Sequence, residues 1–179
     1  MSFDRRTLAL ALTGAAILPA AAMAQQAAPR ANTPPQNMSG VAPDQLAMRT
    51  HEAGTFSLMT ARVGVEKATN ADVKRFAQFE VQEQEGVAQA MRLAGHNFPE
   101  PRFEGEKAQI LQRLRGAGSG NEFDMMFLQV QEQGHQELLN LTTAIMQGNA
   151  PAPDKIMATL ANGQIKEHLI LIGLMRGQR

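Results

Sequence analysis

Residues 44–95, DQLAMRTHEAGTFSLMTARVGVEKATNADVKRFAQFEVQEQEGVAQAMRLAG, decide the fold. Apolar residues recur there at three- and four-residue intervals, the periodicity of amphipathic helices. We expect Asp44 to cap a first helix, Thr69-Asn70 to form a tight turn and cap a second, and Gly95 to end the second. Two long helices joined by a short turn pack side by side in opposite directions, so the stretch predicts an antiparallel helical hairpin.

The chain after this hairpin predicts a second one. The expected elements are a proline-containing loop over 96–103, a short amphipathic helix over 104–115, a long helix capped by Asn121 and running to Gln147, and a last helix capped by Asp154 and ending near Met175. No segment alternates as a strand does. Two hairpins joined by a crossover with a short helix are the connectivity of a ferritin-like bundle. The expected fold is therefore all-α, an antiparallel four-helix bundle over residues 44–176.

Residues 1–24 have the pattern of a cleavable export signal. Arg5-Arg6 precede an apolar run, and Ala22-Met23-Ala24 provides a small-x-small cleavage site, so we expect cleavage after Ala24. The apolar run is too short for a permanent membrane span, and no transmembrane segment is expected in the mature chain. The predicted location is the periplasm. Arg5-Arg6-Thr7-Leu8 also resembles a twin-arginine signal, which leaves both the general secretory route and the route for folded proteins open.

The segment between this signal and the bundle, residues 25–43, is rich in Gln, Ala, Pro and Asn and has almost no large apolar residue. Such a segment cannot bury enough surface to offset its loss of conformational entropy on ordering. We therefore expect a flexible spacer, which gives three parts: signal 1–24, spacer 25–43 and helical domain 44–176.

Composition excludes several function classes. The 17 basic and 17 acidic residues cancel, so the chain lacks the positive charge expected of a nucleic-acid-binding protein. Cysteine is absent, which excludes disulfides, thiolate catalysis and cysteine ligands to metals. A metal site in this chain must use histidine, carboxylate or amide groups. Tyrosine and tryptophan are absent as well, so the core must be built from aliphatic residues and eight Phe, which favours helices over sheets.

Polar residues lie within the apolar arcs of three predicted helices. Glu80 and Gln84 are in the arc of the second helix, and His135 is in that of the third with Glu132 at its edge. Gln164 and His168 are near the centre of the arc of the last helix, which is formed by Ile156, Met157, Leu160, Ile165, Leu171, Ile172, Leu174 and Met175. The first helix presents small residues and no inward carboxylate. An unpaired buried polar group costs about 1–3 kcal/mol, so these side chains are expected to converge and pair with one another, with water or with a metal ion.

Three interpretations of this polar set remain open. It could be a satisfied polar layer that fixes the register of the bundle. It could hold a divalent transition metal, iron, manganese or zinc, through His135, His168 and Glu80 with help from Gln84 or Glu132. It could also serve a partner or a small ligand. Glu132-x-x-His135 matches the spacing of di-metal bundles, but Ile165 stands three residues before His168, so the second copy of that motif is incomplete. His51 and His96 are interpreted as surface residues.

Three runs of sequence carry a resemblance to a known family. They are Val65 to Gln78 (VEKATNADVKRFAQ), Phe127 to Gln136 (FLQVQEQGHQ), and Glu167-His168. Over Asp44 to Met175 the chain resembles an exported bacterial domain family of unknown function, ferritin-like, whose members are labelled outer-membrane or periplasmic proteins.

The resemblance implies a ferritin-type metal constellation with one Glu in the first helix, an Asp-His pair in the second and one His in each of the last two. His135 and His168 match, whereas Ser57 stands in place of the Glu and Glu83-Gln84 in place of the Asp-His pair. Glu80, one turn before Gln84, is the residue expected to compensate.

The expected function is that of a periplasmic helical-bundle protein of unassigned activity, related to the envelope or to stress, with a degenerate metal site and no enzymatic role. The alternatives are a functional metal-binding protein of oxidative stress and a helical module that docks a partner. The partners expected are an envelope protein or a second copy of the chain, and no nucleic acid.

Overall fold

The computed structural model describes residue 38 and residues 40–177, which form five α-helices and no strand. The prediction of an all-α fold is confirmed for this part of the chain. The helices are α1 (Pro43–Lys67), α2 (Ala71–Leu93), α3 (Gly105–Gly116), α4 (Asn121–Gln147) and α5 (Ala152–Met175). The predicted export signal and residues 25–37 and 39 of the predicted spacer lie outside the described residues.

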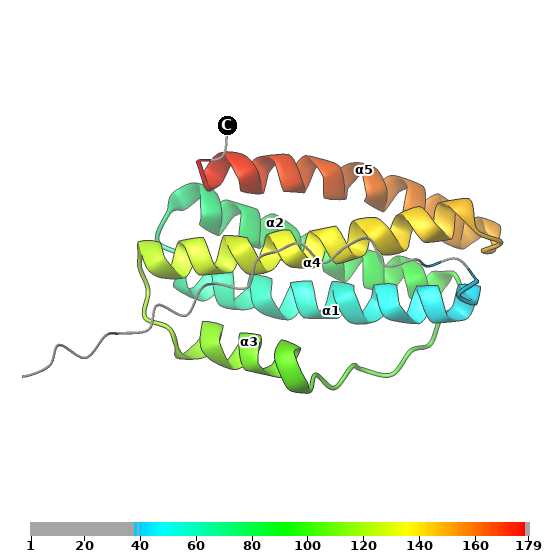
Figure 1. The fold of residues 1–179 in the computed structure, drawn as a ribbon, viewed down its shortest axis with the longest axis horizontal. Coiled ribbons are helices and arrows are strands. Elements are labelled where there is room, and N and C mark those ends of the chain that lie inside the picture. Colours follow the sequence, from blue (N-terminus) through cyan, green and yellow to red (C-terminus); the bar gives the residue numbers. More distant parts are fainter. Residues whose placement is uncertain (1–37, 39, 178–179) are drawn as a thin grey trace, which may run out of the picture. The chain divides into compact units, whose positions relative to one another are not determined.

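The four long helices run side by side, and the short helix α3 lies outside them against α1 and α4 (Figure 1). Helix α1 packs extensively against α2 and α4, and α5 packs extensively against α4. By contrast, α2 and α5 contact each other only sparsely. The connection from α2 to α4, which contains α3, runs along the length of α1 (Figure 1). Three of the four seams between the long helices are therefore tightly packed, and the seam between α2 and α5 is loose.

The helix ends follow local signals at two of the predicted positions and not at three others. The Asn70 side chain accepts from the backbone N–H groups of Asp72 and Val73 and caps α2, as predicted. Gly95 follows the end of α2 with φ +95°, a conformation that favours glycine. The caps predicted at three other residues are wrong, because α1, α4 and α5 begin one or more residues earlier, after Ala42, Gly120 and Pro151. The residues concerned, Asp44, Asn121 and Asp154, lie in the first turns.

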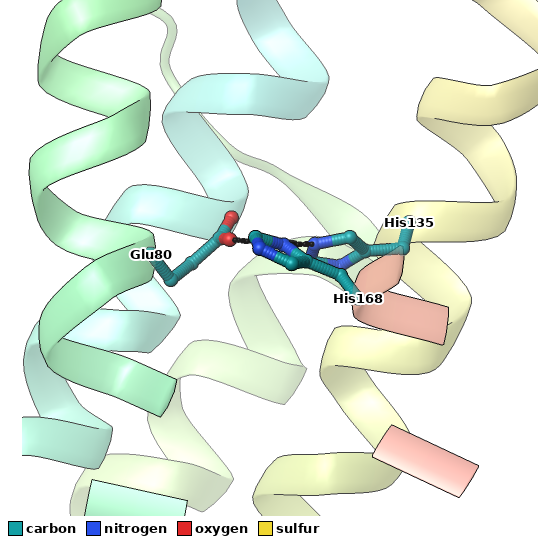
Figure 2. Close-up of side chains that lie close together, drawn as sticks. All are labelled: Glu80, His135 and His168. Atoms are coloured by element: carbon teal, nitrogen blue, oxygen red, sulfur yellow. Dashed lines mark hydrogen bonds and ion pairs between the residues drawn. The ribbon is translucent and has the colours of Figure 1, made fainter. Parts of the chain in front are cut away.

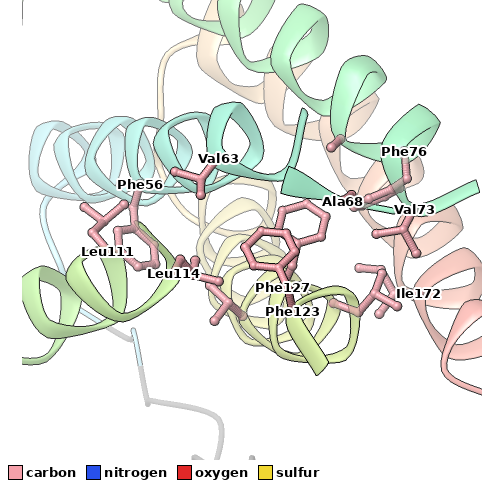
Figure 3. Close-up of a cluster of buried hydrophobic side chains, with 13 residues drawn as sticks. Phe56, Val63, Ala68, Val73, Phe76, Leu111, Leu114, Phe123, Phe127 and Ile172 are labelled. Carbon is pink, nitrogen blue, oxygen red and sulfur yellow. The ribbon is translucent and has the colours of Figure 1, made fainter. Parts of the chain in front are cut away.

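Two apolar clusters fill the space between the helices. The first, the aromatic core, is shown in Figure 3 and includes Phe56, Val63, Phe76, Leu111, Leu114, Phe123, Phe127, Leu128 and Ile172. The second, the aliphatic core, contains Leu46, Ala53, Leu138, Leu141, Ile145, Ala158 and Ile165. Along α4, buried Gln131 and His135 lie between Phe127 of the first cluster and Leu138 of the second. Polar side chains therefore separate the two cores at this level.

One face of α5 departs from the sequence prediction. The side expected to face inward included Ile156, Leu160, Leu171 and Leu174, yet these four are exposed, and so is Gln164. The prediction is wrong for these residues, although Ile165, Ile172 and His168 of the same side are buried as expected. The reason is that α5 packs extensively against α4 alone, so only a narrow stripe of the helix is covered. An apolar composition all round a helix does not say which side its neighbours will cover.

The last residues of the predicted spacer contact the helical domain. Met38 and Val41, both partly buried, pack against the aliphatic core. Among the described residues, none of the helices combines the length and the apolar character that crossing a membrane requires.

Candidate metal centre

Three buried side chains from three helices meet between the two cores. Glu80 comes from α2, His135 from α4 and His168 from α5, and they are 0%, 1% and 8% exposed. Oε2 of Glu80 lies 3.3 Å from Nε2 of His135 and 3.2 Å from Nδ1 of His168. The two ring nitrogens are 3.0 Å apart. Figure 2 shows the carboxylate and both imidazoles pointing toward one another, so three potential ligand atoms share one small volume.

The other nitrogen of each imidazole is held by an acceptor. Nδ1 of His135 donates to the backbone carbonyl of Gln131 at 2.7 Å, because a carbonyl oxygen can only accept. Nε2 of His168 lies 3.2 Å from Oε2 of Glu83, a half-buried carboxylate. Both outward nitrogens therefore carry a proton. When the rings are neutral, the two inward nitrogens present lone pairs toward each other and toward Glu80.

Glu80 is fixed by one oxygen and leaves the other free. Its Oε1 accepts from Oγ of Ser57 at 2.7 Å and from Nε2 of Gln84 at 3.0 Å. Its Oε2, also buried, has no partner with hydrogen-bond geometry. Ser57 and Gln84 stand at the positions where the family resemblance implies ligands, and here both donate to the Glu80 carboxylate.

A buried polar group that the sequence analysis missed supports Ser57. The Gln131 side chain is 1% exposed, with its Oε1 2.9 Å from Oγ of Ser57 and its Nε2 2.8 Å from Oγ1 of Thr60. The sequence did hold a signal for Gln131, because this residue stands one turn before His135 on the same face of α4. The chain Gln131, Ser57 and Glu80 ties α4, α1 and α2 together beside the two histidines.

The charges in this cluster are strongly coupled. Burial by itself raises the pKa of Glu80, but the adjacent imidazoles of His135 and His168 and the hydroxyl of Ser57 outweigh burial and hold that pKa well below its usual value. For His168, burial favours the neutral ring, but the carboxylates of Glu80 and Glu83 outweigh it and raise the pKa to about 9. Without a metal ion, an ionised Glu80 and a protonated His168 are therefore expected at neutral pH, with one inward proton shared among the three side chains.

The remaining predicted site residues lie elsewhere. Gln84 contacts Glu80 and not the histidines. Glu132 forms an ion pair with Arg176 just after α5, away from the three converging atoms. Gln164 is exposed. The surface interpretation of two histidines is wrong, because both are partly buried: Nε2 of His96 pairs with Asp154 at 2.7 Å, and the ring of His51 lies 5.6 Å from that of Phe98.

A groove with a volume of about 340 Å³ lies beside the cluster along the loose seam between α2 and α5. Most of its lining is apolar or small, including Gly86, Ala90, Ala158 and Ala161, and Glu83 contributes a carboxylate to its wall. Because Glu83 also contacts His168, the groove extends to the outer side of the three-residue cluster.

Comparison with known proteins gives one family. The model of a domain of unknown function, DUF4142, matches residues 20–171. Neither the curated proteins nor the solved structures include a match to the chain.

Proposed function

Because this chain belongs to the DUF4142 family of domains of unknown function, we propose its function from the cluster itself: Glu80, His135 and His168 bind one divalent transition-metal ion. The observation that carries this proposal is the convergence of two imidazole nitrogens and a carboxylate oxygen that has no partner with hydrogen-bond geometry in a buried site. Such an arrangement is costly unless a proton or a metal cation lies among the three atoms, and a divalent cation can satisfy all three at once.

The spacing of the three atoms fits a shared ion. Donor atoms that bind the same zinc or iron at about 2.0–2.2 Å lie roughly 3.0–3.4 Å from one another in tetrahedral or octahedral geometry. The three separations between Glu80, His135 and His168 are 3.0, 3.2 and 3.3 Å. The proton that His168 holds without metal would be displaced by the ion, as is usual when histidine becomes a ligand.

The outer contacts of the two histidines also fit a metal site. Histidines that bind metal ions generally donate their other N–H to a carboxylate or a backbone carbonyl, which fixes the ring and its tautomer. Here Glu83 supplies the carboxylate for His168, and the carbonyl of Gln131 serves His135. Two imidazoles with one carboxylate suit iron, manganese or zinc. Bound there, the ion would act as a Lewis acid toward water or ligand oxygen, and the protein residues described here would hold and orient it.

The fold and location belong to the same proposal. Four long helices in two hairpins, a long connection between the hairpins, and inward ligands from α2, α4 and α5 support a ferritin-like four-helix bundle. The export pattern of residues 1–24 supports a periplasmic location. Because the site uses no cysteine, its ligands are not exposed to thiol oxidation in a compartment that is not reducing.

Metal analysis tests the proposal. We expect the purified protein, treated with chelator and then dialysed against Zn²⁺, Mn²⁺ or Fe²⁺ in turn, to retain close to one equivalent of at least one of these ions. His135→Ala and His168→Ala should each abolish this retention and the rise in Tm that the ion produces. Glu132→Gln is the matched control, because Glu132 pairs with Arg176 and should leave binding unchanged.

Two results would contradict metal binding. Wild-type protein that retains none of the three ions would favour a polar layer that only fixes the register of the helices. Retention that survives the double substitution of His135 and His168 by Ala would place the ion elsewhere.

The groove favours a second candidate function, the binding of a small apolar ligand. Its volume of about 340 Å³ lies within the range of ligand pockets, and two carboxylates, Glu83 and Asp154, line it without any lysine or arginine. An apolar cation fits this lining better than an anion. We expect decyltrimethylammonium to bind more tightly than decanoate in calorimetric titrations, and Gly86→Leu, which fills the groove, to abolish the difference. Equal binding of the two probes would contradict this candidate.

A further inference from the structure

The outer face of α5 is apolar although no described residue covers it. Ile156, Leu160, Ile170, Leu171 and Leu174 are 47–68% exposed. They are half of the large exposed hydrophobic residues in the described part of the chain. The opposite face of the same helix is buried through Ala158, Ile165 and Ile172. A helix that is apolar on both sides is normally covered on both sides.

The exposed residues follow the spacing of a helix-pairing seam. Positions 156, 160, 163, 167, 170 and 174 alternate intervals of four and three residues, which keeps them on one line along the helix. All six are exposed. Both ends of this line are aliphatic, and its centre holds Gly163 and Glu167. The space over Gly163 is open, since nothing lies within 4 Å of where a Cβ would stand.

The six positions of this line match a second copy of themselves that runs in the opposite direction. If a second copy of α5 runs antiparallel about a two-fold axis at the level of Ile165, then Ile156 faces Leu174 and Leu160 faces Ile170, at both ends. At the centre, Glu167 of each copy faces Gly163 of the other, where the missing side chain leaves room for the carboxylate. A parallel pair would instead set Glu167 against Glu167, which is unfavourable because like charges repel.

From this self-complementarity we propose that the protein forms a homodimer through antiparallel pairing of the outer faces of α5. The apolar area is sufficient: each exposed Leu or Ile offers on the order of 100 Å², so five per copy give about 1,000 Å² across the pair, the lower bound for a specific interface. His168 lies on the inward side of α5, away from this face. The dimer therefore does not depend on metal binding, and each proposal can fail alone.

The first experiment measures the oligomeric state of the whole protein. Sedimentation equilibrium should give twice the monomer mass at micromolar concentration. Leu160→Glu combined with Ile170→Glu should raise the dissociation constant by at least about a hundredfold while the helical circular dichroism stays unchanged, because both side chains are solvent-exposed in the monomer. Leu93→Glu is the matched control: Leu93 is 83% exposed at the end of α2, outside the pairing line, so the dimer should persist.

The second experiment tests the direction of pairing and uses the absence of cysteine in the chain. Ile156→Cys and Leu174→Cys stand 18 residues apart, about 27 Å along the helix. In the antiparallel dimer each faces the other position, so a short bis-maleimide should join the two variants when they are mixed and should join neither variant alone.

Three outcomes would overturn the proposal. A wild-type monomer at 100 µM would remove the dimer. Cross-linking of Ile156→Cys with itself would replace the antiparallel arrangement by a parallel one. A monomer that binds phosphatidylglycerol vesicles, and loses that binding in the Leu160→Glu, Ile170→Glu variant, would assign the outer face of α5 to a lipid surface.

Discussion

The two histidines at the candidate metal centre each use one ring nitrogen inward and one outward. The inward nitrogens lie 3.0 Å apart, and the outward ones are held by Gln131 and Glu83. The tautomer of each ring is therefore decided by its outer contact. At this scale the sequence identified the inward residues, Glu80, His135 and His168, but gave no sign that Glu83 would orient one of them.

Replacing Glu83 tests this orienting role. Glu83→Gln removes the negative charge that holds the Nε2 proton of His168, so Nδ1 is no longer kept as the inward lone pair. We expect the affinity for Zn²⁺ to fall about 10- to 100-fold, the usual loss when such an outer partner of a ligand is removed. Competition titration with a chromophoric chelator measures this affinity in the variant and in the wild type. Glu85→Gln is the control, since Glu85 pairs with exposed Arg62, and an equal loss there would argue against orientation.

At the scale of the elements, a single carboxylate on α4 organises the turn between α1 and α2. Asp124, 3% exposed, accepts from the backbone N–H groups of Thr69 and Asn70 and from the hydroxyl of Thr69, at 2.8–3.0 Å. The hairpin that opens the fold is thus fixed to the start of the second hairpin. Local sequence predicted the turn, but this contact between segments more than 50 residues apart needed the structure.

Removing this contact should cost stability. Asp124→Ala leaves the backbone N–H groups of Thr69 and Asn70 without their charged acceptor, and we expect the free energy of unfolding to fall by about 2–3 kcal/mol, since hydrogen bonds to charged groups are the stronger ones. Urea denaturation measures the change. Asp72→Ala, at an exposed acidic residue in the first turn of α2, should cost less than about 1 kcal/mol. Similar losses of stability in the two variants would show that any negative charge near a helix N-terminus has this effect and that the hydrogen bonds of Asp124 add nothing to it.

Close approach between helices depends on Gly64 of α1. A Cβ at this position would stand 2.7 Å from two ring atoms of Phe127 and 3.0 Å from Cβ of Ala77, which is tighter than packing allows. Gly64→Ala should therefore destabilise the protein by about 1–2 kcal/mol despite the better helix propensity of alanine. Gly86→Ala, with open space around its Cβ, should stabilise it by up to about 1 kcal/mol. Thermal unfolding of both variants tests the contrast, and equal shifts would contradict it.

At the scale of the whole molecule, the cluster couples folding to pH. The folded pKa of His168, about 9, lies above its usual 6.5, so its contribution to stability is complete below pH 6.5 and is lost as pH rises through 9. The pKa of Glu80 is lowered, so its contribution is present above pH 4.5 and is lost as pH falls further. Metal-free protein should therefore be most stable near pH 5–6.5 and weaken steadily toward pH 9.

Guanidinium denaturation of chelator-treated protein between pH 5 and pH 10 measures this trend. His168→Gln should be less stable at pH 6 and should lose most of the alkaline slope. Saturation with Zn²⁺ should reverse the slope below pH 9 in the wild type, because the ion binds the deprotonated ring. Parallel slopes in the wild type and His168→Gln would show that other groups cause the pH dependence.

The sequence by itself determined the helices, both ends of α2, the last residues of α4 and α5, and the candidate ligands. Periodicity, the Asn70 cap and Gly95 act within a few residues, so they can be read locally. Glu80, His135 and His168 stood out because a polar group within an apolar arc needs a buried partner. Only the tertiary structure decided which partners they have. Glu132 pairs with Arg176, Gln164 is exposed, and one apolar side of α5 is left uncovered. The physical reason is that an amphipathic pattern fixes which side of a helix can be buried, whereas burial itself depends on which helices, distant in sequence, pack against that side.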